Sequence, residues 1–517
     1  MQPDAFGASP PTPAPNVPPY VPPAANVDPP PVPVPVRPNP STRRGPRIRI
    51  LLALLLTISL VALGGVAGAA RFDDAPVYPR RWDPRVADIA RFVEQHRGLD
   101  FRHPVQIYFL APARYREIAG GGPTQSAPTA GERRQADQSV AEYRALGLMD
   151  GAPDLLSASE TLQDSGTLAF YSPEDDVVNV RGTKMTPGLR VTLAHELTHA
   201  LQDQHFDLSP IGDAASADES GAARAVVEGD AVAVEHAYIE TLSAADRASY
   251  EAESRSGGDE ADADLADVPT VLQVLFGSYY AVGNAFVDFV QADAGGASRP
   301  GNVDAVLRRL PRGSSQLFEP AIPPARRDPV TVTPPDPAGG ATVLEQSTHG
   351  VDLLFLMLAE RIDPLQALAA TDGWRGDAYT ASTSPDGRTC VASRIEFASP
   401  ADTEEFQNAL VAWAATMPAD SGRSVVPADD QRSIRFTTCD PGPDAKMRLT
   451  GNAGTALGYP VTRLRAAASA IRSGRSRADA LCYGNAVIRR LTLDDLRATE
   501  RTPAIEAALS AAAADCP

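Results

Sequence analysis

The residues best suited to chemistry form the run His195-Glu196-Leu197-Thr198-His199. Four residues along an α-helix turn by about 400°, so both imidazoles project from one face, about 6 Å apart, and can share one zinc ion. Glu196 stands beside them, where its carboxylate can reach a metal-bound water without being a ligand. The pattern therefore predicts one catalytic zinc ion bound by His195 and His199, with Glu196 as general base. The structural alternative is a helix whose histidines only pack or cap.

A catalytic zinc ion needs a third protein ligand and one open position. His205 has the spacing of the third histidine in the pattern HExxHxxGxxH, but Gln202 stands where that pattern has its turning glycine. On an unbroken helix His205 would point about 240° away from His199. Glu228 is the better candidate, because it lies in the helical stretch AVVEGDA, whose small residues would let this helix press against the helix of the histidines.

Two carboxylates can orient the ligand histidines by accepting a hydrogen bond from the ring nitrogen that does not bind the metal. Asp203 lies one helical turn beyond His199, and Asp230 follows Glu228 by two residues. We expect both carboxylates to accept such a hydrogen bond from a ligand histidine; the alternative is that each is a surface carboxylate. His236 lies about two turns from Glu228, and we expect it to be structural.

Two helices that follow a hairpin must position these groups. Residues 168–181 have apolar arms around a SPEDD turn and predict a β-hairpin. The first helix begins at Thr186, a plausible N-cap followed by Pro187, and continues for about five turns. The second begins at Ser216, which forms a capping-box pattern with Glu219.

The rest of the chain mixes helices with strands, which predicts an α+β fold class. Residues 251–267 are acidic and predict a solvated loop, and residues 323–340 predict a Pro-rich surface connection. Further helices are expected near residues 86–98, 269–293, 350–370, 400–416 and 457–515, and strands near residues 105–110, 378–397 and 423–439.

An uncharged run of 21 residues, 50–70, is about as long as the 20 residues that a helix needs to cross a bilayer. Arginines 43, 44, 47 and 49 precede it and keep the N-terminus cytoplasmic. The first 46 residues hold 17 of the 48 prolines and predict a disordered tail. We expect a single-pass cell-membrane protein whose body lies outside; the alternative is a cleaved signal peptide ending near residues 67–69.

The chain is expected to have four parts. Residues 1–47 form the Pro-rich cytoplasmic tail, and residues 48–70 form the transmembrane helix, which contacts membrane lipid. Residues 71–325 form the zinc-binding core, and residues 326–517 form a C-terminal α+β part. The net charge is −18, and because residues 1–49 hold five Arg against two Asp, the remainder carries −21. An acidic body of this kind excludes nucleic acid as an expected partner, and nothing in the sequence indicates an oligomeric state.

All four cysteines follow the apolar run and therefore fall in the compartment where disulfides form. Three pairings are possible. We favour Cys390 with Cys439, because each lies on a strand-like run flanking one helical stretch, which leaves Cys482 with Cys516. Both bonds are expected to be structural.

With HELTHALQDQ followed by an EGDA helix, the chain resembles the gluzincins, the thermolysin-like zinc peptidases, in a bacterial secreted or membrane-anchored form. The segments YYAVGNAFVDFV, NVDAVLRRLP and GWRGDAY extend the resemblance over most of residues 165–415. One segment departs from it: GSSQLFEP has Glu319 where such proteins typically show a His before Pro. The resemblance implies a zincin-like domain in which a strand, the HExxH helix and a Glu-bearing helix form the site.

The resemblance also implies hydrolysis of peptide bonds in a protein or peptide substrate by a zinc-activated water. Such enzymes need a donor for the tetrahedral oxyanion. Tyr280, in the segment YYAVGNAFVDFV, and His349 are candidates by residue type, and Tyr280 is preferred. The alternative function is a catalytically inactive gluzincin-like ectodomain that serves as a binding or cell-envelope structural protein. A membrane-tethered structural protein without metal is the remaining possibility.

Overall fold

The structure of the 517-residue chain is a computed structural model. It describes residues 78–119, 128–165, 167–173, 175–208, 211–212, 214–293, 301–320, 328–337, 339–427, 431–498 and 500–516. The predicted tail and the predicted membrane segment therefore lie outside the described residues. Among the described residues one helix, Thr270–Asp293, is long and apolar enough to cross a membrane, but 61% of its apolar window is buried inside the protein.

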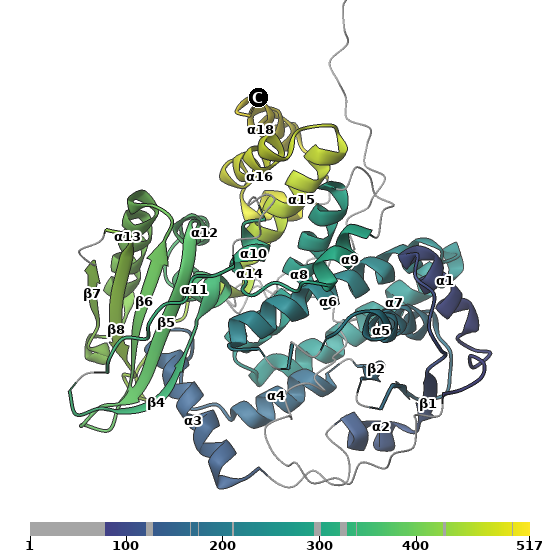
Figure 1. Cartoon of the computed structure of the whole chain (residues 1–517), viewed down its shortest axis with the longest axis horizontal. Coiled ribbons are helices and arrows are strands. Elements are labelled where there is room, and N and C mark those ends of the chain that lie inside the picture. Colours follow the sequence, from purple (N-terminus) through teal and green to yellow (C-terminus); the bar gives the residue numbers. More distant parts are fainter. Residues whose placement is uncertain are drawn as a thin grey trace, which may run out of the picture.

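The described residues fold into two sheets and many helices, which confirms the α+β class (Figure 1). The α-helices are α1 (Ala87–Arg97), α2 (Pro112–Ala119), α3 (Ala130–Ala145), α4 (Leu155–Asp164), α5 (Pro187–His205), α6 (Ala217–Glu240), α7 (Ala244–Asp264), α8 (Thr270–Asp293), α9 (Gly301–Leu307), α10 (Ser315–Phe318), α11 (Gly350–Ala359), α12 (Pro364–Thr371), α13 (Pro400–Thr416), α14 (Ala453–Ala456), α15 (Gly458–Arg472), α16 (Arg477–Arg490), α17 (Leu493–Arg497) and α18 (Pro503–Ala514).

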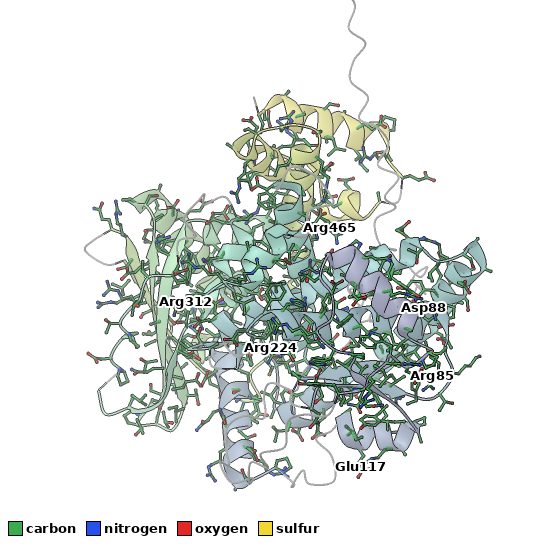
Figure 2. All side chains as sticks on the ribbon, turned by 45° about the vertical axis from the view of Figure 1, so that its right-hand side comes forward. Arg85, Asp88, Glu117, Arg224, Arg312 and Arg465 are labelled. Atoms are coloured by element: carbon green, nitrogen blue, oxygen red, sulfur yellow. A yellow bond between two sulfur atoms is a disulfide. The ribbon has the colours of Figure 1, made fainter. Side chains whose placement is uncertain are left out.

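The smaller sheet has three strands in the order β1-β3-β2. Strand β3 (Val177–Arg181) lies in the middle, parallel to β1 (Gln106–Leu110) and antiparallel to β2 (Ala169–Ser172). The predicted hairpin is therefore present as β2 and β3. Apolar side chains of this sheet, of α1 and of α5 share one buried core, so the sheet carries α5 on its surface. Asp88 on α1, labelled in Figure 2, forms an ion pair with Arg190 on α5 and so joins these two helices.

Helices α5 and α6 begin at the residues that the sequence predicted. Thr186 caps α5 by accepting a hydrogen bond from Leu189 N, with proline in the first turn. Ser216 caps α6 by accepting one from Glu219 N. The returning bond of the capping box is shifted by one residue, because the Glu219 carboxylate accepts from Ala215 N instead of the N-cap nitrogen.

The larger sheet has five antiparallel strands in the order β4-β5-β6-β8-β7. Its strands are β4 (Thr342–Ser347), β5 (Trp374–Thr383), β6 (Thr389–Phe397), β7 (Ser424–Pro427) and β8 (Ser433–Cys439). Helices α3 and α13 pack on it, and Figure 1 shows it apart from the small sheet, with α6 and α8 between them. The largest hydrophobic core joins this sheet to α6, α8 and α11, so it draws on both sides of residue 326.

Both predicted disulfides are present. Cys390 on β6 lies opposite Cys439 on β8 in the strand register, and these residues are bonded. The second bond joins Cys482 on α16 to Cys516, which follows α18. Each bond therefore ties segments that are distant in sequence, 49 residues apart in the first case and 34 in the second.

The predicted acidic loop at residues 251–267 is wrong, because most of it belongs to helix α7. Ser243 caps this helix by accepting a hydrogen bond from Asp246 N. Only two α7 side chains are buried, Tyr250 and Ala261. Because most of this helix faces solvent, its sequence is as polar as that of a loop. The Pro-rich connection is irregular where it is described, over residues 328–337.

Candidate functional site

Helix α5 presents His195 and His199 on one buried face, as the spacing predicts. Their side chains are 0% and 3% exposed, and their ring centroids lie 4.7 Å apart. The helix is buried on almost every side between the small sheet and α6, which explains why both imidazoles are withdrawn from solvent. A third ligand must therefore come from an element that packs against α5.

Helix α6 is such an element. Glu228 Oε2 lies 3.2 Å from His195 Nε2 and 3.3 Å from His199 Nε2. Within the described residues, these three side chains are the group whose donor atoms lie close enough together, all within 4.8 Å, to hold a metal ion. His205 is not part of this group, because its Nε2 lies 2.7 Å from the carbonyl oxygen of Asp100.

The second ring nitrogen of each histidine also has a partner, and neither partner was anticipated from the sequence. His195 Nδ1 lies 3.2 Å from Glu235 Oε2, and His199 Nδ1 lies 3.0 Å from Gln202 Oε1. Glu235 follows Glu228 by seven residues on α6, and Gln202 follows His199 by three on α5, so both share a face with a ligand. These spacings are the sequence signal from which the two partners could have been identified.

Asp230 and Asp203, the two expected second contacts, lie elsewhere. Asp230 reaches His199 only through Gln202, whose amide donates to Asp230 Oδ2 at 2.8 Å. Arg97 on α1 donates to the same Asp230 oxygen at 3.0 Å, which places a positive charge beside the buried carboxylate. Asp203 accepts a hydrogen bond from the hydroxyl of Tyr171 on β2 instead of from a histidine.

Glu196 is fixed by one oxygen and leaves the other available. Its Oε2 accepts a hydrogen bond from Tyr171 N at 2.7 Å, which ties it to the edge strand β2. Its Oε1 is buried and, among the described residues, has no hydrogen-bond partner. Burial raises the pKa of Glu196 to about 7, so this carboxyl can exchange a proton near neutral pH.

Burial and charge act in opposite directions on the three candidate ligands. Burial alone disfavours every charged form, but the Glu228 carboxylate lies against two imidazoles. The contact outweighs burial, lowers the pKa of Glu228 to about 2 and raises that of His195 to about 10. The three side chains are thus built around an anionic carboxylate that attracts positive charge.

The residues present fit a metal ion that prefers nitrogen and oxygen donors. Two imidazole nitrogens and one carboxylate oxygen converge, and His199 Nε2 is buried without hydrogen-bond geometry to any described partner. Each imidazole is held at Nδ1 by an acceptor, so that Nε2 is the nitrogen presented to the centre. Glu196 follows His195 on α5, and its Oε1 has no hydrogen-bond partner among the described residues.

Of the two expected oxyanion donors, Tyr280 lies near this group and His349 is held elsewhere. The Tyr280 ring, on α8, has its centroid 6.4 Å from that of His195 and is buried. Burial raises its pKa well above the ordinary value, so the phenol keeps its proton. His349 stacks on Tyr379 of the large sheet and its Nε2 lies 2.9 Å from Ser393 Oγ.

Other residues singled out in the sequence have structural contacts. Burial of the His236 side chain, on α6, lowers the pKa of its imidazole. Glu319 accepts hydrogen bonds from Gly373 N at the start of β5. Asp377 of the GWRGDAY segment accepts from the backbone nitrogens of His349 and Gly350 and so caps α11.

Comparisons with known proteins reach only the C-terminal part of the chain. Residues 341–453 match the model of a family described as Domain of unknown function (DUF8575). The match spans β4 to β8 with α11 to α13, and excludes the group formed by His195, His199 and Glu228. No curated protein and no solved structure matches the chain.

Proposed function

We propose that the chain is a zinc metallopeptidase of gluzincin type, anchored in the membrane with its catalytic part outside. The observation that carries this proposal is the convergence of Glu228 with His195 and His199, beside a Glu196 that retains one unpartnered oxygen. Two imidazoles and one carboxylate form the donor set of catalytic zinc sites with an open position. The order of β2, α5 and α6 around the site supports a zincin-like domain.

The chain's own residues divide the work of hydrolysis. Zinc, when bound by His195, His199 and Glu228, supplies a Lewis acid that polarises a peptide carbonyl and lowers the pKa of a water molecule. Glu196 Oε1 takes a proton from the attacking water and passes it to the leaving amine, which suits a carboxyl whose pKa is about 7. The protonated phenol of Tyr280 is the candidate donor to the oxyanion.

Strand β2 lies beside the proposed base. It is an edge strand of the small sheet, and its Tyr171 N points to Glu196. An extended peptide that adds to such an edge forms main-chain hydrogen bonds and lies beside the proposed base.

The proposed location depends on the sequence of residues 50–70 and on the two disulfides. Disulfides form and persist outside the cytoplasm, which supports an extracytoplasmic body. Alkylation of intact cells with a membrane-impermeant maleimide after mild reduction should label Cys482, whose sulfur belongs to a partly exposed residue. Labelling that requires prior lysis would place the body in the cytoplasm instead.

The test of the enzyme uses the full chain, solubilised in detergent, with zinc content and casein cleavage measured on the same samples. Wild type should bind one zinc ion and cleave casein. Glu196→Gln should keep the zinc and lose about 100-fold or more of the cleavage rate, because a general base contributes about 10²–10⁴. Glu160→Gln, at an exposed position of α4, is the matched control and should retain full activity.

Two results would overturn parts of this proposal. One zinc ion with no cleavage of casein or of a mixed peptide library by wild type would favour the inactive binding or envelope protein. If wild type holds no zinc even after incubation with excess zinc and removal of the unbound metal, the zinc site is excluded. The membrane-tethered structural protein without metal then remains.

A further inference from the structure

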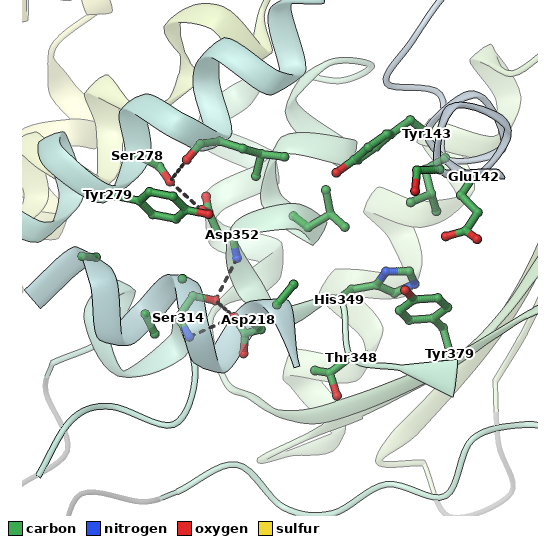
Figure 3. A pocket seen from close by; sticks show the side chains of 18 of the residues that line it. Glu142, Tyr143, Asp218, Ser278, Tyr279, Ser314, Thr348, His349, Asp352 and Tyr379 are labelled. Atoms are coloured by element: carbon green, nitrogen blue, oxygen red, sulfur yellow. Dashed lines mark hydrogen bonds between the residues drawn. The ribbon is translucent and has the colours of Figure 1, made fainter. Parts of the chain in front are cut away.

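A second site shares helices α6 and α8 with the first but none of its ligands: it lies at the N-terminal turns of α6, before Glu228, and on the face of α8 that carries Tyr279. A cavity of about 380 Å³ is lined by residues of α3, α6, α8, α10 and α11 and of the strands β4, β5 and β6 (Figure 3). Tyr279 and Tyr280 are consecutive residues of α8, but Tyr279 lines the cavity whereas Tyr280 lies near His195 in the first site. The candidate metal ligands do not line the cavity. Its volume falls within the range of pockets for small molecules.

The lining of this cavity carries negative charge with no positive side chain to balance it. Its ionisable acids are Glu142, Asp218, Glu345 and Asp352, and neither Lys nor Arg is among the lining residues. The single lining histidine, His349, does not compensate, because burial lowers its pKa to about 3 and leaves it neutral. The cavity is therefore suited to a cationic ligand.

The first pair of acids lies deep in the cavity. Asp218 is 8% exposed and accepts hydrogen bonds from the backbone nitrogen and the hydroxyl of Ser314. Asp352 Oδ2 accepts from Ser278 Oγ at 2.8 Å. Its Oδ1 is shielded from solvent and, among the described residues, has no hydrogen-bond partner. An ammonium group at this position would satisfy that oxygen.

The second pair lies at the other side, as Figure 3 shows for Glu142 against Asp218 and Asp352. Glu142 on α3 is half-buried, and Glu345 on β4 is exposed, so the cavity reaches solvent at this end. The Tyr379 hydroxyl donates to Glu345 Oε1 at 3.0 Å. Tyr143 and Tyr379 line the same end, where aromatic rings add an attraction for cations; one face of the Tyr379 ring is covered by the stacked His349.

Burial makes these acids unfavourable as anions when nothing compensates them. It raises the pKa of Asp352 and Glu142 to about 7 and that of Asp218 to about 6. A neighbouring carboxylate contributes to two of these shifts, Asp218 to that of Asp352 and Glu345 to that of Glu142. A metal ion is a poor explanation, because in the described part of the chain only His195, His199 and Glu228 converge closely enough to bind one.

We propose that this cavity binds an alkyl diamine or polyamine, with one ammonium group at Asp218 and Asp352 and a second at Glu142 and Glu345. Two separated acid pairs joined by an apolar and aromatic wall match a flexible carbon chain with a positive charge at each end. The deep ammonium donates to Asp352 Oδ1, and the outer ammonium lies between the two glutamates and the tyrosine faces. This site is independent of the proposed peptidase activity.

The test is calorimetric titration of the full chain in detergent with α,ω-diaminoalkanes of three to eight carbons. Affinity should pass through a maximum at one chain length, because only that length spans both acid pairs. At the best length, the monoamine with the same carbon chain should bind at least 10-fold more weakly, and the corresponding carboxylate should not bind. Equal affinity for the amine and the uncharged alcohol would reduce the site to a hydrophobic cavity and overturn the proposal.

Substitutions at the two ends make the test specific. Asp352→Asn and Glu142→Gln should each lower the affinity for the best diamine at least 10-fold, while Glu404→Gln, exposed on α13, should leave it unchanged. Glu142→Gln alters a half-buried side chain at the outer end, so it serves as the second variant if Asp352→Asn does not fold. No diamine binding by wild type, or unchanged binding by both cavity variants, would overturn the proposal.

Discussion

Glu235 Oε2 lies 3.2 Å from Nδ1 of His195, on the side of the ring opposite to Glu228. One helix, α6, thus contacts both nitrogens of the same imidazole with carboxylates seven residues apart. An acceptor at Nδ1 holds the proton there and leaves the Nε2 lone pair for a metal. Gln202 does the same for His199, since its amide nitrogen donates to Val227 O and Asp230 and its oxygen is left to accept.

Loss of this contact should weaken metal binding while the three ligands remain in place. We expect Glu235→Gln to raise the zinc dissociation constant about 10- to 100-fold, the usual effect of removing a partner of a ligand histidine. Competition with a chromogenic chelator measures this constant. Glu240→Gln, exposed on the same helix, should leave it unchanged. Equal zinc affinity of wild type and Glu235→Gln would show that Glu235 does not orient His195.

The parts of the site that the sequence predicts are those set by local geometry. The four-residue spacing of His195 and His199 fixes their shared face on any helix, and Thr186 with Pro187 fixes where that helix begins. The strand-like runs around Cys390 and Cys439 likewise predict a strand at each cysteine, and the structure pairs these two strands. None of these inferences requires knowledge of how distant segments pack.

The parts that the sequence misses depend on packing between helices. The small residues near Glu228 were expected to bring α6 against α5, yet Gly229 faces α8, where a Cβ would lie 2.3 Å from the backbone of Gly283. Ala225 also faces that glycine. The partners of Asp203 and Asp230 likewise come from other elements, β2 and α1, whose approach no local pattern encodes.

The close contact of α6 with α8 should make Gly229 sensitive to substitution. The added Cβ of Gly229→Ala meets backbone atoms at 2.3 Å, so the helices must separate, and overpacking of this kind costs about 1–3 kcal/mol or more. Glu228 is the adjacent residue, so zinc affinity should fall as well. Urea unfolding and chelator competition measure the two effects.

Gly257→Ala on α7 is the control for that substitution. It also replaces a helical glycine, but its Cβ would meet nothing within 4 Å. It should raise the free energy of unfolding by about 0.5–1 kcal/mol through helix propensity and leave zinc binding intact. Destabilisation of both variants by the same amount would mean that helix packing at Gly229 is not the cause.

The disulfide between β6 and β8 should contribute strongly to the stability of the large sheet. It closes a loop with a sequence separation of 49, for which the chain-entropy model gives about 4 kcal/mol. We expect the double substitution of Cys390 and Cys439 by Ser to lower the free energy of unfolding by about 2–4 kcal/mol, measured by chemical unfolding. The double substitution of Cys482 and Cys516 should instead increase hydrogen exchange mainly in α16 and α18. Undiminished stability of the first variant would contradict the structural role of its disulfide.

Burial of His349 should make the stability of the protein depend on pH. Its side chain is enclosed between Tyr379 and Phe436, and burial lowers its pKa from 6.5 to about 3. Between these values the unfolded chain binds a proton that the folded chain does not, so stability falls as the pH decreases from about 6.5 towards 3. Above pH 6.5 the histidine is neutral in both states and contributes no pH dependence.

The substitution His349→Gln removes this proton and isolates its effect. The measured quantity is the free energy of unfolding of wild type minus that of the variant. It should decrease by about 1.4 kcal/mol for each unit by which the pH is lowered between pH 6 and 4. Buried acids with raised pKa values, such as Asp352, have the opposite dependence, losing stability as the pH rises, and they cancel in this difference because both proteins contain them. Urea unfolding at half-unit pH steps measures it, with His205→Gln as a control at a partly exposed histidine. A difference that stays constant over this range would show that His349 is protonated in the folded protein.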